Sequence, residues 1–246
     1  MIIRHKKPFS VGVVFAISFL GILLLIFSPL FGNGLNGLQY ADDSFNKLAK
    51  GSSYFIPKVA KGNEKFVGKT FSVSINMSKE GDKAGDAEKR AELASRVYTT
   101  AGAVTEIKGA ELKIEGDLGK VLEAALQDSD AMFKNEGEKI KAKYATDDEK
   151  KMFRQWHNTL TKIDKAFKKD KKFEEAGIVS EVTKKAVEPA YNFYQVDANK
   201  VADHAGMMSG LLIFYVAYTM WWGFAIFYMF EGIGLTMKKA KVRKEV

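Results

Sequence analysis

An uncharged apolar run from Met207 to Phe230 constrains this chain more than any other feature. As an α-helix, its 24 residues would be about 36 Å long, which is enough to cross the hydrocarbon core of a bilayer. A second uncharged run extends from Phe9 to Phe31. The sequence therefore predicts two membrane-spanning helices, over residues 9–31 and 207–235, with residues 32–206 between them.

Both runs have basic residues on the side that leads to a chain end. Arg4, Lys6 and Lys7 precede the first run, and Lys238, Lys239, Lys241, Arg243 and Lys244 follow the second. Segments rich in lysine and arginine normally stay in the cytoplasm and attract anionic lipid headgroups. We therefore expect a bacterial inner-membrane protein with cytoplasmic tails at residues 1–8 and 236–246 and a periplasmic or extracellular domain at residues 32–206.

A cleaved secretory signal is the alternative interpretation of the first run, since a basic start before an apolar run is also typical of such signals. The run is long for a signal, however, and no A-x-A-like cleavage site lies between Phe31 and Tyr40. We therefore expect the first helix to be retained.

The formal net charge of +8 by itself suggests a nucleic-acid partner, but most of this excess lies in the two tails. The two tails carry 8 of the 38 basic residues, and the region between the spans has a net charge of only about +2. We therefore expect no nucleic-acid partner. Because the chain has no cysteine, disulfides, attached c-type haem, cysteine-ligated iron–sulfur clusters and thiol catalysis are excluded, and we expect no cofactor.

The region between the spans is expected to form a mainly helical, bundle-like domain. From Phe71 to Met77, apolar and polar residues alternate with the period of a half-buried strand, and a weaker alternation covers Ala110–Glu115. A helix is predicted between them at Asp86–Thr100, so the two segments could pair as a small two-stranded β element. An all-helical domain is the alternative, because short alternating segments are ambiguous by pattern alone.

Helix signals are firmer in the second half of this domain. Asp117 is a good N-cap for a helix that ends near Asn135, and Thr146–Glu149 matches a capping box. The apolar positions after that box predict a buried stripe: Met152, Phe153, Trp156, Leu160, Ile163 and Phe167. The last helix is expected to continue without interruption from Ala190 to Leu235, as a stalk that enters the second span.

Two segments are expected to lack helix. Gly32–Gly37 holds three glycines and two asparagines, which predicts a hinge-like exit from the first span. Ser52–Gly68, around Pro57, is predicted to be irregular chain.

The spans supply the strongest candidates for contact with another subunit or with lipid. Small residues four positions apart allow close helix packing, and the spans hold two such pairs: Gly12 with Ala16, and Gly206 with Gly210. Trp221 and Trp222 lie near the middle of the second span, whereas lipid-facing tryptophans concentrate near the interfaces. Since a buried indole N–H needs a hydrogen-bond partner, these tryptophans indicate contact with other helices, a bound lipid or a quinone.

Two ionisable residues flank the second span. His204 precedes it at the expected membrane surface, where a titrating group could contact headgroups, a quinone or a partner; a plain polar residue is the alternative. Glu231 lies at its inner end, where an ionisable residue suggests function; a structural ion pair with the following lysines is the alternative. No metal-ligand spacing connects His5, His157 and His204, and Asp128–Asp130 lacks the glycine and glutamate of a calcium loop, so we expect no metal site.

The order of elements resembles the sensing half of bacterial chemoreceptors and sensor kinases that have periplasmic four-helix domains: a short cytoplasmic start, a span, a helical outer domain and a second span. This resemblance implies an extracytoplasmic sensor. The hinge at Gly32–Gly37 and the strand-like segments depart from a simple bundle. With 16 residues after Phe230, such a sensor is expected to signal through another protein.

Two hypotheses about function follow. The first is a non-catalytic accessory subunit whose spans pack against other membrane protein subunits and whose outer domain contacts a partner; a homo-oligomer also stays open. The second is the sensor or ligand-binding module that signals in trans. An enzyme is not expected, since no nucleophile–base pair, phosphate loop or metal cluster can be recognised in the sequence.

Overall fold

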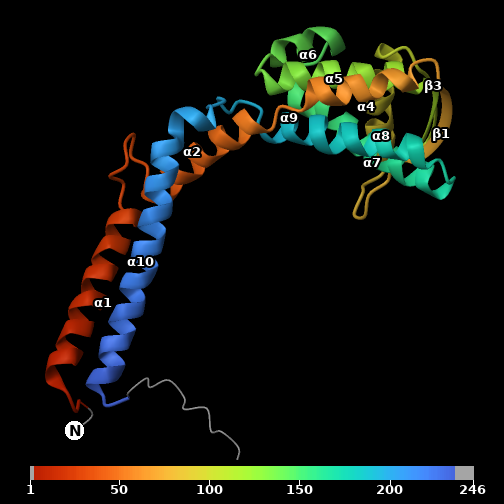
Figure 1. Cartoon of the computed structure of the whole chain (residues 1–246). Helices are drawn as coiled ribbons and strands as arrows, with labels where there is room; N and C mark the ends of the chain where they lie inside the picture. Colours follow the sequence, from red (N-terminus) through yellow and green to blue (C-terminus); the bar gives the residue numbers. More distant parts are fainter. Residues whose placement is uncertain (1–2, 236–246) are drawn as a thin grey trace, which may run out of the picture. The chain divides into compact units, whose positions relative to one another are not determined.

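The computed structural model describes residues 3–235, and the chain divides into two compact units. The hairpin unit consists of the described residues of Met1–Leu48 and Asn199–Val246, and the core unit is Ala49–Ala198. Figure 1 labels most of the helices and two of the strands. The predicted basic tail at residues 236–246 lies outside the described residues.

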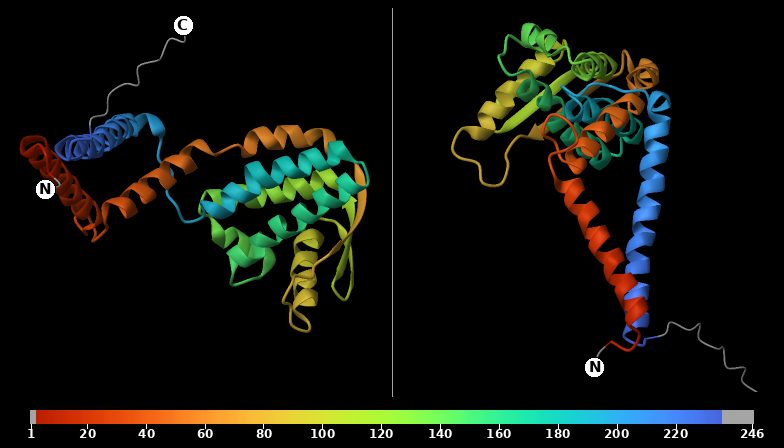
Figure 2. Two further views of the ribbon diagram at one scale, coloured as in Figure 1. Left: turned by 90° about the horizontal axis from the view of Figure 1, so that it is seen from below. Right: turned by 90° about the vertical axis from the view of Figure 1, so that its left-hand side faces the viewer.

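The hairpin unit contains the two long apolar helices, α1 (Lys6–Phe27) and α10 (Ala205–Gly232). Both are long and apolar enough to cross a membrane by length and composition, and only 6 % of the most apolar stretch of each is buried, unlike a soluble core helix. They lie antiparallel and converge at the end that carries the N-terminus (Figure 2). Both helices end earlier than predicted, and the second ends where Gly234 adopts a left-handed conformation with φ of +88°.

The predicted break after the first span is confirmed. Residues 32–34 all have positive φ, at 85°, 50° and 74°, a conformation that glycine and asparagine tolerate best. The next helix, α2 (Gly37–Ser52), begins with a reciprocal cap. Asn36 Oδ1 accepts a hydrogen bond from Gln39 N (2.9 Å), and Gln39 Oε1 accepts one from Asn36 N (3.0 Å). Helix α1 already ends at Phe27, before these residues; the positive-φ segment keeps the chain non-helical until this cap starts α2.

The core unit contains a three-stranded antiparallel sheet in the order β1–β3–β2. Its strands are β1 (Thr70–Asn76), β2 (Val104–Lys108) and β3 (Glu111–Asp117). The two predicted strands pair with each other as β1 and β3, so the all-helical alternative is wrong. The prediction missed β2, which joins β3 through a two-residue turn at Gly109–Ala110, where Gly109 has φ of +59°.

Helices form most of the rest of the core unit. They are α3 (Ile56–Asn63), the 3-10 turn η1 (Glu64–Phe66), α4 (Asp86–Thr100), α5 (Leu118–Phe133), α6 (Gly137–Tyr144), α7 (Glu149–Lys169), α8 (Phe173–Val182), the π-helical turn η2 (Thr183–Val187) and α9 (Glu188–Asn192). The bounds predicted for α4 are confirmed. The prediction of irregular chain around Pro57 is wrong, because this proline lies in the first turn of α3, where a missing N–H costs no hydrogen bond.

The predicted buried stripe of α7 is confirmed and forms the centre of the core. Trp156 packs against Tyr98 of α4, with ring centroids 5.2 Å apart, and Phe167 packs edge to face on Phe71 of β1 at 6.1 Å. Burial of each such aromatic side chain contributes about 1.5–3 kcal/mol. One face of the sheet therefore packs on the helices, while the other carries polar residues such as Ser72.

The N-cap of α5 is confirmed, but that of α7 differs from the prediction. Asp117 Oδ1 accepts a hydrogen bond from Lys120 N (3.1 Å). At α7, Asp148 rather than Thr146 is the cap, and its Oδ1 accepts a hydrogen bond from Lys151 N (2.8 Å). The predicted capping box is therefore wrong: the cap lies two residues later, at an aspartate, and the residue three positions on is Lys151, which cannot accept the reciprocal hydrogen bond.

The predicted continuous stalk from Ala190 is wrong. Helix α9 ends at Asn192, and the short 3-10 turn η3 (Val201–His204) precedes α10. Gln195 has φ of +66°, which no α-helix accepts. Asn135 holds this segment, since its Oδ1 accepts a hydrogen bond from Gln195 N (2.8 Å) and its Nδ2 donates one to Val196 O (3.1 Å).

Candidate functional site

The two apolar helices touch through glycines at the end where they converge. A Cβ at Gly12 of α1 would lie 2.6 Å from Met229 N, and a Cβ at Gly232 of α10 would lie 2.5 Å from Phe9 Cβ. Neither position has room for a larger residue without a backbone shift. His5 N also donates a hydrogen bond to Gly232 O (2.9 Å). The start of α1 is therefore attached to the end of α10 by close packing and by backbone hydrogen bonds.

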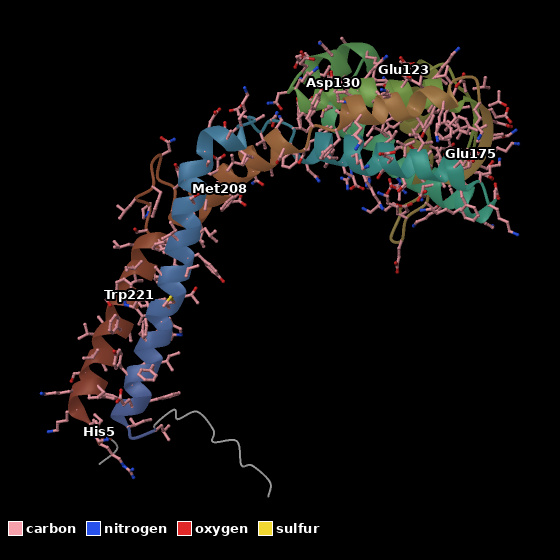
Figure 3. All side chains as sticks on the ribbon, in the orientation of Figure 1. His5, Glu123, Asp130, Glu175, Met208 and Trp221 are labelled. Carbon is pink, nitrogen blue, oxygen red and sulfur yellow. The ribbon has the colours of Figure 1, made fainter. Side chains whose placement is uncertain are left out.

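Aromatic side chains continue this contact toward the middle of the helices. Trp221 Nε1 donates hydrogen bonds to Phe15 O and to Ser18 Oγ, each at 3.2 Å, and Trp221 lies partway along α10 beside α1 (Figure 3). Tyr218 stacks on Phe19 with ring centroids 4.1 Å apart, and its hydroxyl donates to Phe19 O at 3.1 Å. The indole partner that the sequence led us to expect thus lies in the chain's own first apolar helix.

An apolar hollow opens beside the Trp221 contact. Its volume is about 390 Å³, and its lining is almost entirely carbon: Ser10, Val11, Val14, Phe15, Ser18 and Trp221. The Ser18 hydroxyl donates within its own helix, to Val14 O at 2.8 Å, so it offers the hollow no free donor. Such a hollow accepts an apolar side chain or an acyl chain rather than a polar ligand.

The other small residues and the second tryptophan lie apart from this contact. Ala16 is half-buried on α1. Gly206 and Gly210 face open space, since a Cβ added to either would meet no described atom within 4 Å. Trp222 stays 38 % exposed, although its ring lies 4.8 Å from that of Phe19. Of the two predicted small pairs, the structure therefore brings only Gly12 against the neighbouring helix.

The two ionisable candidates lie near opposite ends of α10. His204 closes η3, and its Nδ1 lies 3.2 Å from Lys200 O. Glu231 is half-buried in the last turn of α10. The lysines expected to pair with it lie outside the described residues.

In the core unit, a buried lysine joins the two ends of the unit. Lys50 is 2 % exposed; its Nζ donates to Asn135 Oδ1 (3.0 Å) and Val196 O (2.5 Å) and lies 5.3 Å from the centre of the Phe133 ring. Burial lowers the pKa of Lys50 from its ordinary value of 10.5, while the nearby Asp197 carboxylate opposes this shift. The sequence offered no signal for this contact, since its partners lie 85 and 146 residues away.

No protein-family model, curated protein or solved structure matches this chain. Among residues 3–235, no group of three or more aspartate, glutamate or histidine residues is placed to hold a metal ion. Any conclusion about function therefore depends on the geometry of the two units.

Asp128, to which the sequence prediction assigned no role, is a buried carboxylate of the core. It is 2 % exposed and accepts hydrogen bonds from Trp156 Nε1 (2.8 Å), Lys143 Nζ (2.6 Å) and the Tyr144 hydroxyl. Burial, followed by the adjacent carboxylate, raises the pKa of Tyr144 far above its ordinary range. An aspartate at a core-facing helix position was the available signal, because a buried charge needs several partners.

His157 also has a partner that the sequence did not indicate. Its Nε2 lies 3.3 Å from Glu188 Oε1, and both side chains are partly exposed. A cavity of about 260 Å³ adjoins the pair, lined also by Arg154 and Tyr191. The Arg154 guanidinium lies 5.9 Å from the centre of the Tyr191 ring. The positive charge of Arg154 is therefore already engaged in a cation–π contact.

Proposed function

We propose that this chain is a non-catalytic, membrane-anchored accessory subunit that docks on other membrane protein subunits through α1 and α10. The core unit, on this proposal, lies outside the cytoplasm and contacts a further part of the same complex. The observation that carries the proposal is the apolar hollow beside Trp221, which two helices form and neither fills.

The hollow suits a docking surface because the polar side chains beside it already have hydrogen-bond acceptors within the two helices. Trp221 Nε1 and the Tyr218 hydroxyl both donate within the hairpin unit, so a partner would not have to supply buried hydrogen bonds. Close glycine contacts hold the walls of the hollow together. A prebuilt surface loses less entropy on association than a flexible one. We propose a large apolar side chain from a third transmembrane helix as the occupant, and packing of this kind drives helix association in lipid.

The outward side of α10 adds to this surface. Its exposed aromatic residues include Trp222, Phe224, Phe227 and Phe230. Trp222 lies away from both ends of the helix, whereas lipid-facing tryptophans concentrate at the two interfaces. Contact with a neighbouring subunit would account for its position.

The test compares two serine-to-leucine variants. Ser10→Leu would fill the hollow, while Ser209→Leu adds the same side chain to an exposed position of α10 that does not line it. After gentle detergent extraction from the native membrane, native-gel separation and mass spectrometry would identify what co-migrates. We expect the wild type and Ser209→Leu to retain a fixed set of partners and Ser10→Leu to lose them. If the wild type migrates alone, or Ser10→Leu keeps every partner, the docking proposal is wrong.

We also propose that the membrane is a bacterial inner membrane, crossed twice, with both chain ends in the cytoplasm. Single cysteines test this arrangement without background, since the chain has none. A membrane-impermeant thiol reagent applied to intact cells should label Lys139→Cys in the core unit and should not label Arg4→Cys. Labelling of both, or removal of Arg4 from the mature chain, would contradict the two-span topology and favour a cleaved signal.

A second candidate function is a ligand-binding module that signals in trans. A cavity of about 350 Å³ between α3 and α5 favours it, because both apolar and polar side chains line this cavity. Binding of a small molecule to the wild-type chain, with no stable partner subunit, would favour this candidate over the accessory role.

A further inference from the structure

Strand β1 forms one edge of the sheet, and one side of its backbone has no neighbouring strand. The sheet order is β1–β3–β2, and Figure 1 shows β1 outside β3 at the margin of the core unit. Leu118 N donates a hydrogen bond to Lys69 O, and Met77 N donates one to Ala110 O, each at 2.8 Å. Because bonded and non-bonded pairs alternate in an antiparallel ladder, the odd-numbered residues of β1 bond to β3. The even-numbered residues therefore point their N–H and C=O groups away from the sheet.

This outer edge of β1 lacks the features that normally protect a strand edge. Its outward-pointing residues are Thr70, Ser72, Ser74 and Asn76. Within residues 3–235, the structure shows no hydrogen bond to the backbone N–H or C=O groups of these four residues. Natural proteins usually protect edge strands with lysine, proline, a bulge or a short length. Strand β1 has seven residues, none of them charged and none a proline, and it pairs with β3 without a bulge.

The opposite edge of the same sheet is protected. Strand β2 has five residues, and only Thr105 and Ile107 point their backbone groups outward. The strand carries two charged residues, Glu106 and Lys108, which form an ion pair at 2.9 Å. The Thr105 hydroxyl also lies 2.6 Å from the hydroxyl of Ser95 on α4. The open, uncharged edge is therefore particular to β1 and is not a general property of this sheet.

The sequence of β1 is suited to antiparallel pairing with itself. Pairing about a two-fold axis at Val73 would place Ser72 opposite Ser74 of the second copy. The next outward pair would be Thr70 opposite Asn76. Every outward residue would then face another outward residue and exchange two backbone hydrogen bonds with it. Small hydroxyl side chains opposite each other also favour such a pair.

Charge and the shape of the surface favour a second copy over a strand from a different protein. In this register, residues 67–79 place no like charges opposite each other, and Lys69 would face Met77. Domains that add a foreign strand to a sheet edge take their specificity from pockets for alternate side chains. No residue of β1 lines any of the cavities described above. A strand whose sequence matches itself needs no such pocket.

We propose that two copies of this chain associate by antiparallel pairing of their β1 strands, which joins the two sheets into one sheet of six strands. The association uses the core unit, whereas the docking residues belong to α1 and α10. It does not rest on the docking proposal, so either proposal can fail without the other.

Single cysteines test the register in the membrane, since the chain has none of its own. The full-length variants Ser72→Cys and Ser74→Cys would be co-expressed and oxidised with copper phenanthroline. In the proposed register the two positions lie about 5.5 Å apart between Cα atoms, which a disulfide can bridge. Two copies of the same position lie on a diagonal, about 7–8 Å apart, which is too far. We expect several-fold more covalent dimer in the mixture than in either variant alone. Ser72→Cys mixed with Glu106→Cys is the control, because Glu106 is exposed on the opposite edge strand.

Two proline variants test whether the free edge of β1 is the contact. Ser74→Pro removes an outward N–H group and leaves the bonds to β3 in place, which is how proline is tolerated in an edge strand. Thr105→Pro is the matched control, since it removes an outward N–H group from β2. Light scattering of the purified full chain in detergent, over a dilution series, would give the dissociation constant of the dimer. We expect Ser74→Pro to raise this constant at least about tenfold and Thr105→Pro to leave it unchanged. Circular dichroism would check the helical content of each variant.

Three results would overturn the proposal. One is a wild-type chain that stays monomeric at every concentration measured. Another is a cysteine mixture that cross-links no more than its separate variants or the control mixture. The third is a Ser74→Pro chain that keeps its helical content and dimerises as tightly as the wild type. If Ser74→Pro does not fold, the cysteine mixture decides the question by itself. Cross-linking of Ser72→Cys or Ser74→Cys to a different protein, without a covalent dimer, would also overturn the proposal, because a foreign strand would then occupy the edge.

Discussion

Removal of the Asp128 carboxylate should take away much of the free energy of unfolding of the core unit. Asp128→Ala deletes the acceptor shared by Trp156 Nε1, the Tyr144 hydroxyl and Lys143 Nζ. Trp156 is fully buried and Tyr144 is 4 % exposed, so neither donor can turn to water. The Lys143 side chain is 29 % exposed and can do so.

The expected cost follows from these exposures. Each buried donor left without an acceptor costs about 1–3 kcal/mol, so Trp156 and Tyr144 together cost about 4 kcal/mol. Lys143 adds little, because a partly exposed ammonium regains water. Since domains of this size are stable by only about 5–15 kcal/mol, Asp128→Ala should remove roughly a quarter to four fifths of the free energy of unfolding. Trp156 Nε1 and the Tyr144 hydroxyl share Oδ2 of Asp128, so Asp128→Asn can keep an acceptor for both and should cost clearly less than Asp128→Ala, although the bonds lose the charge of the carboxylate.

The measurement is urea unfolding of the full chain in detergent, followed by the fluorescence of Trp156. Replacing Trp221 and Trp222 with phenylalanine in every chain leaves Trp156 as the single reporter. Asp130→Ala is the matched control, because Asp130 lies on the same helix and also has two donors, but Tyr54 and Lys134 are exposed to water. We expect this control to cost less than about 1 kcal/mol.

The predicted role of Asp128 is refuted if Asp128→Ala costs no more than Asp130→Ala. A double-variant cycle gives a second check. Tyr144→Phe removes a buried donor, so in its presence Asp128→Ala should cost less than it does alone. Simple additivity of the two changes would mean that the hydrogen bond between Asp128 and Tyr144 contributes no coupling energy.

Two further predictions concern other contacts. Gly12→Leu should force α1 and α10 apart at Met229, at a cost of about 1–3 kcal/mol. It should also shift the fluorescence emission of Trp221, measured in a chain whose other tryptophans are replaced by phenylalanine. The control Gly210→Leu should not shift this emission, because open space surrounds Gly210. Lys50 has a pKa below its ordinary 10.5 when folded, so the unfolded chain binds its proton more readily and stability should rise as pH approaches 10.5. Lys50→Met should make that rise smaller than in the wild type in urea unfolding measured across the alkaline range, while the part contributed by Lys162, whose pKa burial also lowers, stays. An unchanged rise would show that Lys50 contributes none of it.

Patterns confined to one element led to correct predictions. The alternation at Phe71–Met77 and the stripe of α7 report which side chains leave water, and the period of that signal identifies a strand or a helix without knowledge of the neighbour. Asp117 caps α5 through an N–H three residues away, which is equally local. The β2 strand was missed although Val104–Lys108 followed by Gly109–Ala110 is a readable hairpin signal.

Predictions that needed a distant partner were wrong or were not made. The sequence from Ala190 to Leu235 could form one continuous helix. Asn135 nevertheless holds Gln195 and Val196 in a non-helical conformation, from 60 and 61 residues away in the sequence. Two hydrogen bonds to a fixed side chain outweigh a weak helix preference, because propensities differ by less than about 1 kcal/mol per residue. No local pattern records such a contact.

The apolar runs at Phe9–Phe31 and Met207–Phe230 are enough to predict two helices suited to a membrane, since length and lack of charge are properties of the chain alone. Where the donors of those helices find acceptors depends on the fold. Trp221 reaches Phe15 across 206 residues, and Asp128 reaches Trp156 across 28. Hydrophobicity can be read residue by residue, whereas a hydrogen bond exists only when folding brings both of its atoms within about 3 Å of each other.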